Sequence, residues 1–330
     1  MIFFSSIPPF LAPSSFPIPV PKTSNSTTMF ASMKTLPLRS ASLALLAITA
    51  GTVHAASLAY DDFNYTAGTV INNSSSANGG DGWQGPWSGN SSLVTVVGSA
   101  TTLTYNDGAL TYGGGNSMSV SGGNSQNAAA RAFSATTLKD GSDVYFSFLI
   151  RIVDTANPNK TGVVDAGSFL SVSLLDSGFQ PASDNGIIFA GSSFGARVGN
   201  INSTVSTSLQ YGTTYLVVGR FSGWDSGSQT YQQTSVWLNP THEDFVETSF
   251  GSKVAGANYA SISSTTTLGS DGYRGITLRT HEIGTTVYLI DALQIGTTWN
   301  DVVLSTIPEP SSAASVFGFA ALVAAQRRRR

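Results

Sequence analysis

Cysteine is absent from the 330 residues, and this absence excludes several kinds of chemistry. No disulfide can form, so the folded chain must gain its stability from a sizeable hydrophobic core or from bound ions. Thiol nucleophiles and zinc sites built on cysteine are excluded as well. A chain of this length can bury a core of the required size.

Charged residues are also scarce, and they are unevenly placed. They make up 11% of the chain, against about 25% in an ordinary soluble protein. No acidic residue precedes Asp61, whereas residues 56–306 carry 18 acidic and 9 basic side chains, which gives a net charge of −9. An acidic body of this kind argues against binding nucleic acid through its phosphates. The abundance of Gly, Ser, Thr and Asn is typical of an extracellular β-rich protein with many turns.

Residues 33–55, "MKTLPLRSASLALLAITAGTVHA", have the pattern of a secretory signal peptide. Lys34 and Arg39 form the basic start, an apolar run follows, and small residues stand at the end. We therefore predict a signal-peptide helix, export through the Sec machinery and cleavage between Ala55 and Ala56, with a buried helix as the alternative. Residues 1–32 show no periodicity, and we interpret them as a disordered extension upstream of the true start. Met1 and Met33 both remain candidate starts.

The chain ends in "IPEPSSAASVFGFAALVAAQRRRR", residues 307–330. Its prolines favour an extended, accessible segment. Residues 313–325 are apolar or small, and as a helix they would span roughly 20 Å, less than the bilayer core of about 30 Å. We expect a short transmembrane helix that inserts transiently. The basic cluster that would stay on the cytoplasmic side consists of Arg327, Arg328, Arg329 and Arg330.

This order of features resembles the PEP-CTERM sorting signal, whose motif is matched by Pro308, Glu309 and Pro310. Proteins with this signal are exported by Gram-negative, often biofilm-forming bacteria. The resemblance implies that an exosortase recognises the segment in the inner membrane and cleaves near the motif. It also implies delivery to the cell surface or the extracellular matrix.

The body between the two signals, residues 56–306, is predicted to be a single all-β domain. The clearest strand is residues 143–154, "DVYFSFLIRIVD", where apolar residues alternate with period two. Further strands are expected at residues 168–177, 186–191, 213–224, 232–240, 274–280 and 286–296. Short strands bounded by turn residues, without long helices between them, favour an antiparallel sandwich.

Two stretches of the body resemble laminin-G/concanavalin-A-like modules: "YLVVGRFSGW" with "VWLNP", and "YLIDALQIGTTWNDV". That resemblance implies an antiparallel jelly-roll sandwich. The opening "YDDFNYTAGT" with "GGDGWQGPWSG" resembles the start of many exported PEP-CTERM proteins.

The body offers little catalytic chemistry. His242 lies in a loop after a strand and His281 at a strand end, and surface histidines are the more frequent interpretation. Serines are so abundant that each one carries little information about a hydrolase nucleophile, including Ser193 in the single Gly-x-Ser-x-Gly match at residues 191–195. Bacterial glucanases of this fold carry Glu-x-Asp-x-x-Glu on one strand. The nearest approach here, residues 243–247, departs from that spacing, so we predict no catalytic residue and no enzyme.

Ligand binding and metal binding stay open. Trp83, Trp87 and Trp224 lie in turn regions and are candidate aromatic platforms for carbohydrate, whereas Trp237 is expected in the core. No cofactor is required, but structural calcium could be held by loop carboxylates, although turn aspartates are more often structural. The calcium candidates are Asp61, Asp62, Asp184, Asp225, Asp271 and Asp291, and we select Asp184, Asp225 and Asp271 from them.

The sequence thus favours an exported, exosortase-sorted surface or matrix protein with a binding or structural sandwich. Its expected partners are the exosortase, the Sec machinery and an exopolysaccharide, and no nucleic acid. The alternative is a jelly-roll polysaccharide hydrolase.

Overall fold

The computed structural model describes residues 57–303 apart from 73–74, 90–92, 99–101, 107–110, 123–124, 135–140, 166–168, 177–180, 200, 241–257 and 264–271. These residues belong to one unit of the chain, Thr52–Arg330. The predicted signal-peptide helix and the predicted C-terminal apolar helix lie outside the described residues.

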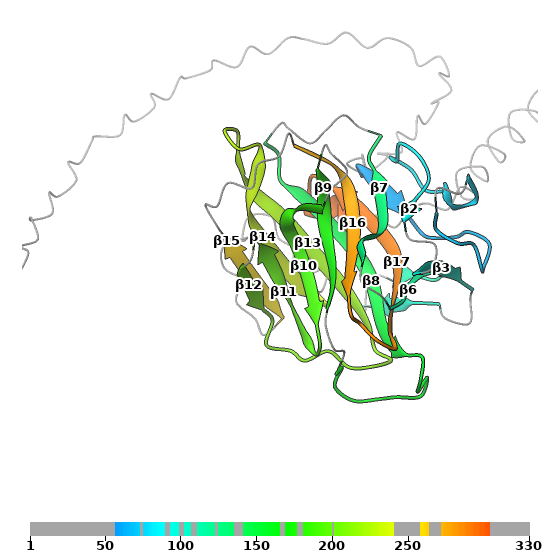
Figure 1. Cartoon of the computed structure of the whole chain (residues 1–330). Coiled ribbons are helices and arrows are strands. Elements are labelled where there is room, and N and C mark those ends of the chain that lie inside the picture. The colour runs from blue at the N-terminus through cyan, green and yellow to red at the C-terminus, as the bar shows by residue number, and fades with distance from the viewer. Residues whose placement is uncertain are drawn as a thin grey trace, which may run out of the picture. The chain divides into compact units, whose positions relative to one another are not determined.

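Two antiparallel β-sheets face each other (Figure 1). Sheet 1 has eight strands in the order β15-β14-β13-β8-β17-β6-β3, with β1 paired to β17 beside β6. Its strands are β1 (Ala59–Asp61), β3 (Val94–Val97), β6 (Ser117–Val120), β8 (Val144–Asp154), β13 (Thr214–Asp225), β14 (Thr230–Leu238), β15 (Tyr259–Ser263) and β17 (Thr286–Gly296).

Sheet 2 has seven strands in the order β12-β11-β10-β9-β16-β7-β2. Its strands are β2 (Ser88–Gly89), β7 (Ser125–Ala132), β9 (Phe169–Asp176), β10 (Pro181–Ala190), β11 (Ser193–Val198), β12 (Ile201–Thr204) and β16 (Tyr273–His281). A 3₁₀ turn, η1 (Ser75–Ala77), precedes β2. The crossovers between distant strands confirm the predicted antiparallel jelly-roll sandwich.

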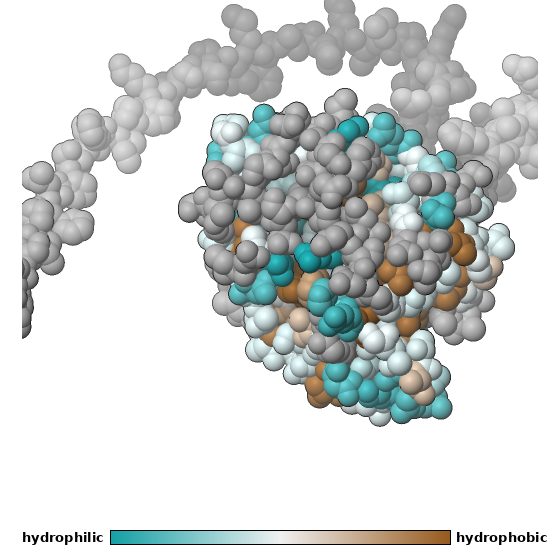
Figure 2. Space-filling view, viewed as in Figure 1, coloured by the Kyte–Doolittle hydropathy of each residue, from teal (hydrophilic) through white to brown (hydrophobic). Residues whose placement is uncertain are grey.

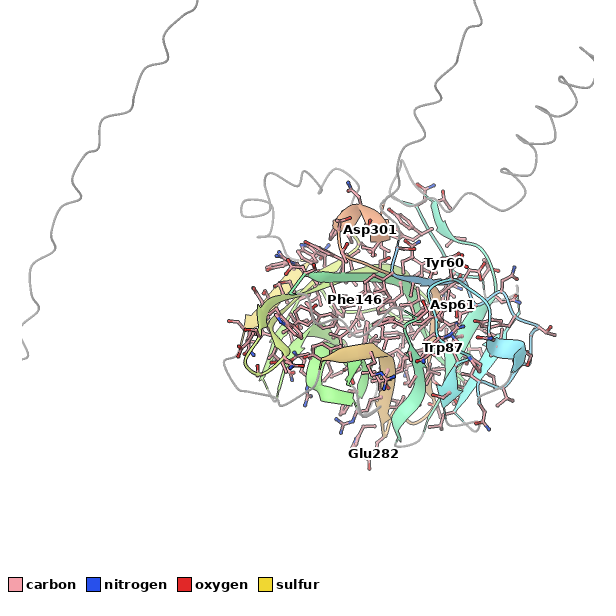
Figure 3. The ribbon with its side chains drawn as sticks, turned by 90° about the horizontal axis from the view of Figure 1, so that it is seen from above. Tyr60, Asp61, Trp87, Phe146, Glu282 and Asp301 are labelled. Carbon is pink, nitrogen blue, oxygen red and sulfur yellow. The ribbon has the colours of Figure 1, made fainter. Side chains whose placement is uncertain are left out.

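The predicted alternation of β8 explains the main core. The residues of its apolar face, from Val144 to Ile152, are buried between the sheets. Figure 3 shows Phe146 in this interior. Gly219 of β13 is paired with Phe146, and a Cβ at Gly219 would lie 1.9 Å from the Phe146 ring. The ring therefore uses the space above a glycine, and it stacks on Phe221 at 5.0 Å.

A second apolar cluster covers the opposite face of sheet 1. It is built from the other face of β8, from a hairpin of β4 (Thr104–Asn106) and β5 (Thr111–Gly113), and from helix α1 (Trp299–Val303). The Tyr112 hydroxyl donates to the Val303 carbonyl at 2.7 Å and so joins hairpin to helix. The Ser147 hydroxyl donates to the Val302 carbonyl at 2.6 Å and joins the helix to β8. We call the hairpin and α1 together the outer layer.

The outer layer and several strands were not predicted. The structure begins β10 at Pro181, earlier than the predicted residue 186. To the strands predicted one by one it adds β1, β2, β3, β6, β7, β11, β12, β15 and the β4–β5 hairpin. Within the part of the chain that the structure describes, no helix has the length and apolar character needed to span a membrane. Hydrophilic and hydrophobic residues are intermixed over the described surface in the view of Figure 2, so colour alone marks no binding face there.

Candidate functional site

Many of the predicted site residues lie outside the described residues. These are Ala55, Ala56, His242, Asp271, Pro308, Glu309, Pro310, Arg327, Arg328, Arg329 and Arg330, together with residues 243–247. Asp184 lies in β10, but its side chain is not described. The predictions for sorting, cleavage and two calcium ligands therefore stay predictions.

Trp87 is a core residue and not an exposed platform. Its side chain is fully buried, and its ring lies 5.7 Å from that of Phe63. The indole N–H donates to Asp61 Oδ2 at 2.6 Å. The interpretation of Trp87 as a ligand contact is thus wrong, because a buried ring presents no face to a sugar. Gly-rich sequence around it suggested exposure, but here the glycines permit close packing.

Asp61 is the centre of this cluster, in the N-terminal segment that holds Tyr60, Asp61 and Trp87 close together (Figure 3). Its carboxylate is fully buried and accepts hydrogen bonds from the Tyr65 hydroxyl at 2.5 Å and from the Phe63 amide at 2.8 Å, in addition to Trp87. It also forms an ion pair with Arg131. Burial raises the pKa of Asp61, and these donors oppose the rise. Because an indole, a guanidinium and an amide N–H can only donate, they hold the carboxylate as an acceptor.

Arg131 comes from β7 and points toward the core, where its side chain is 1% exposed. Its remaining N–H groups donate to the carbonyls of Gly85 at 2.8 Å and Gly79 at 2.9 Å and to the Asn78 side chain at 3.2 Å. The guanidinium also lies 4.9 Å above the Trp83 ring. One buried arginine thereby ties the N-terminal segment to sheet 2.

Trp83 takes part in the same packing. Its indole N–H donates to the Tyr60 carbonyl at 2.9 Å, and its ring stacks on Phe133 at 5.7 Å. Two neighbouring glycines have positive φ, and a Cβ at either would collide with the β1 backbone: Gly80 with the Tyr60 carbonyl at 2.1 Å and Gly82 with the Leu58 carbonyl at 2.0 Å. The segment 79–89, part of the motif that resembles the opening of exported PEP-CTERM proteins, therefore packs against the β1 segment and has a structural role in this fold.

Trp224 is half-buried at the end of β13. Its ring meets Tyr231 edge-on at 5.0 Å, and Tyr231 stacks on Tyr273 at 5.4 Å. The buried Asn185 amide donates to the Tyr231 carbonyl at 2.5 Å and to the Tyr273 hydroxyl at 3.0 Å. Trp224 and Trp83 are the two proposed platform residues that keep partial exposure.

Asp225 caps the turn that follows Trp224. Its carboxylate accepts the Gly227 amide at 2.8 Å and the Ser228 hydroxyl at 2.9 Å, and these bonds lower the pKa of Asp225. This is a local turn role of the kind common for aspartate. Among the described residues no group of three His, Asp or Glu side chains is arranged to hold a metal ion.

Other described acidic residues also have structural partners. Lys160 donates to Asp154 at 3.3 Å and to Asp165 at 2.7 Å, and Arg220 pairs with Asp143. A retaining glycosidase needs two carboxyl groups about 5 Å apart across the bound sugar. The carboxylates of Asp154 and Asp165 are instead joined through a shared lysine.

His281 is half-buried and stacks on Phe169 at 5.5 Å.

No protein-family model matches the sequence. No curated protein matches it either.

Among solved structures, the chain is similar to lectin II from Ulex europaeus at 11% identity and a TM-score of 0.36, covering 66% of this chain and 94% of the lectin. It is similar to the binding domain of botulinum neurotoxin DC, in complex with rat synaptotagmin II, at 11% identity and a TM-score of 0.36. That match covers 72% of this chain and 49% of the other, so the chain spans about half its length. A sialidase matches at 12% identity and a TM-score of 0.37, covering 74% of this chain and 19% of the sialidase. Likeness at this level identifies no function, and the fold class rests on the strand pairing.

Proposed function

We propose that this protein is exported and sorted to the cell surface or extracellular matrix, where its β-sandwich acts as a non-catalytic binding or structural module. The observation that carries the proposal is the position of the two signals relative to the folded body. The first described strand, β1, begins at Ala59, just beyond the expected cleavage after Ala55. The last described element, α1, ends at Val303, just before the segment that starts at Ile307.

Both signals can therefore be removed without loss of a described strand. Residues 33–55 combine a basic start, an apolar run and small residues before the cleavage site, as Sec export requires. Residues 307–330 combine a Pro-Glu-Pro motif, a short apolar run and a basic end, the order that an exosortase would recognise. Four arginines favour retention of the extreme C-terminus on the cytoplasmic side during sorting.

Deletion of residues 307–330 tests the sorting proposal. We expect the truncated protein to be exported and folded but found in the periplasm or the medium, because β1 to α1 remain intact. Fractionation with an antibody against the body measures the location. A matched variant, Glu309→Gln, should shift the location in the same direction while preserving the apolar run. A truncated protein that stays where the full-length protein resides would contradict the proposal.

The ligand proposed for the sandwich is an exopolysaccharide, with the half-buried Trp83 and Trp224 as candidate contacts. Exposed aromatic faces beside hydrogen-bonding groups suit sugar rings. The test is a glycan array with residues 56–306, with and without calcium. Binding that is weakened by Trp224→Ala but not by the mild control Arg220→Met supports a binding module. If no glycan is bound with or without calcium and no sugar is released, the sandwich is a structural module.

A further inference from the structure

A second buried carboxylate, Asp291, lies at the point where β17 changes its neighbour. β17 pairs with β6 through Tyr288–Ile290 and with β1 through Leu293–Ile295. Between these stretches its register with β8 shifts, and Ala292 adopts a positive φ of 51°. Asp291 Oδ1 accepts the Ala292 amide at 2.7 Å. The carboxylate thus supports a β-bulge, which leaves an amide without its usual ladder partner.

The other oxygen of this carboxylate has no such partner. Asp291 is 1% exposed, and Oδ2 lacks a hydrogen bond of normal geometry. The β4–β5 hairpin lies directly over it, because a Cβ at Gly113 would be 3.2 Å from Oδ2 and 2.2 Å from the Leu103 carbonyl. A buried carboxylate with an unpaired oxygen destabilises the folded state unless it is protonated or is paired with a positive charge or hydrogen-bond donors.

The charges around Asp291 increase this cost. Burial, together with the nearby carboxylates of Asp62 and Asp61, raises the pKa of Asp291 to about 7, although the Ala292 and Gly114 amides oppose the rise. Tyr60 of β1 faces the same group, and its own pKa is raised by burial and by these carboxylates. Arg151, on that face of β8, donates to Thr214 at 2.7 Å and to the Thr102 carbonyl at 3.4 Å. The other titratable groups of the described outer layer are Tyr105, Tyr112 and Asp301.

We propose that protonation of Asp291 controls the packing of the outer layer. When Asp291 is neutral, the β4–β5 hairpin stays packed against sheet 1, and when Asp291 ionises, the hairpin and α1 loosen. The hairpin is coupled to the helix through the Tyr112 hydroxyl and the Val303 carbonyl. Loosening would uncover the apolar surface made by Leu103, Leu149 and Leu216. The fold would then present different surfaces in acidic and neutral surroundings.

The direction of the effect follows from linkage. Opening the hairpin returns Asp291 to water, where its pKa falls to the ordinary value of about 4. The closed state therefore binds the proton more tightly, and closing is favoured most in acid. As pH rises between about 4 and 7, the open fraction should rise by up to about tenfold per pH unit. Above about pH 8 the dependence should level off, because Asp291 is then ionised in both states.

Hydrogen exchange of the full-length chain between pH 5 and 8 measures this opening. After correction for intrinsic exchange, the amides of β4 and β5 should lose protection as pH rises. Asp291→Asn keeps the shape and the acceptor oxygen but cannot ionise, so protection should become independent of pH. The control Asp165→Asn removes a carboxylate paired with Lys160 and should leave the hairpin's pH dependence unchanged.

Asp62→Asn provides a test that needs no change at Asp291. Removal of one neighbouring negative charge should move the midpoint of hairpin opening to lower pH, because it stabilises ionised Asp291. A purely structural role for Asp62 would not move that midpoint. Hairpin protection that is flat between pH 5 and 7 in the wild-type chain would overturn the proposal. So would a pH dependence that persists in Asp291→Asn.

Discussion

The Arg131–Asp61 ion pair yields a quantitative prediction about stability. Replacement of Arg131 by methionine keeps much of the apolar length of the side chain but leaves Asp61 fully buried without its counter-ion. Removal of one partner of a buried pair costs about 3–5 kcal/mol. The variant also gives up the bonds to Gly79 and Gly85, which tie the N-terminal segment to β7. We expect a loss of about 4 kcal/mol in the free energy of unfolding.

Urea unfolding of residues 56–306, followed by tryptophan fluorescence, measures this loss. A change of about 4 kcal/mol corresponds to a fall in Tm of roughly 10 °C for a domain of this size. The loss should shrink toward acid pH, because an uncompensated, buried Asp61 has a raised pKa and the folded state then binds the proton more tightly. Asp61→Asn combined with Arg131→Met should recover part of the loss, since no charge remains buried.

Arg220→Met is the matched control for this experiment. Arg220 and Asp143 form an ion pair whose side chains are 25% and 28% exposed, and pairs near the surface contribute about 0–1 kcal/mol. Equal losses for Arg131→Met and Arg220→Met would refute the reasoning that burial makes the Asp61 pair decisive. A double variant no more stable than Arg131→Met alone would refute it as well.

Two further predictions concern packing and turn chemistry. Gly219→Ala places a Cβ 1.9 Å from the Phe146 ring, so chemical denaturation should show a loss of about 1–3 kcal/mol in the free energy of unfolding. The control Gly85→Ala should lose far less, because nothing lies within 4 Å of a Cβ at that position. Similar losses in the two variants would contradict the role of close packing at Gly219. Asp225→Ala removes the acceptor for Gly227 and Ser228. Because the pKa of Asp225 is lowered in the fold, its contribution is present at neutral pH and lost in acid. Thermal unfolding should show a lower Tm for this variant at pH 7, and the difference should shrink as the pH falls below the ordinary range of an aspartate pKa. A difference that stays constant into acid would contradict the capping role.

Alternating strands were predictable because period two is a local property of the sequence. Residues 143–154 predicted β8 closely, and residues 286–296 predicted β17 with the bounds that the structure has. The second apolar face of β8 was visible as Tyr145 and Leu149, yet the layer that covers it comes from short, polar-looking strands far away in the chain. No local pattern in β4 or β5 indicates that partner.

The buried cluster at Asp61 was harder to predict because it depends on contacts between distant residues. Arg131 occupies an inward position of β7 in line with Ala129 and Phe133. A charged residue at such a position signals a need for a buried partner. That partner stands 70 positions earlier in the chain, and sequence spacing does not identify it. Trp87 was misplaced for the same reason, since its hydrogen-bond acceptor is Asp61.

Asp291 shows a similar limit. It was a weak calcium candidate on composition alone, and the structure instead gives it a bulge amide and a covering hairpin. The switch of β17 between β6 and β1 that creates the bulge is a property of the whole sheet. A bulge at this residue could not be derived from "YLIDALQIG" alone.

The most direct test of the account is the intact mass and terminal sequence of the protein recovered from the surface of its own cells. We expect a mature chain that begins at Ala56 and lacks the C-terminal arginines, with every described strand retained. A surface protein that begins upstream of Met33, or that keeps residues 307–330 in full, would contradict the assignment of these segments as removable signals.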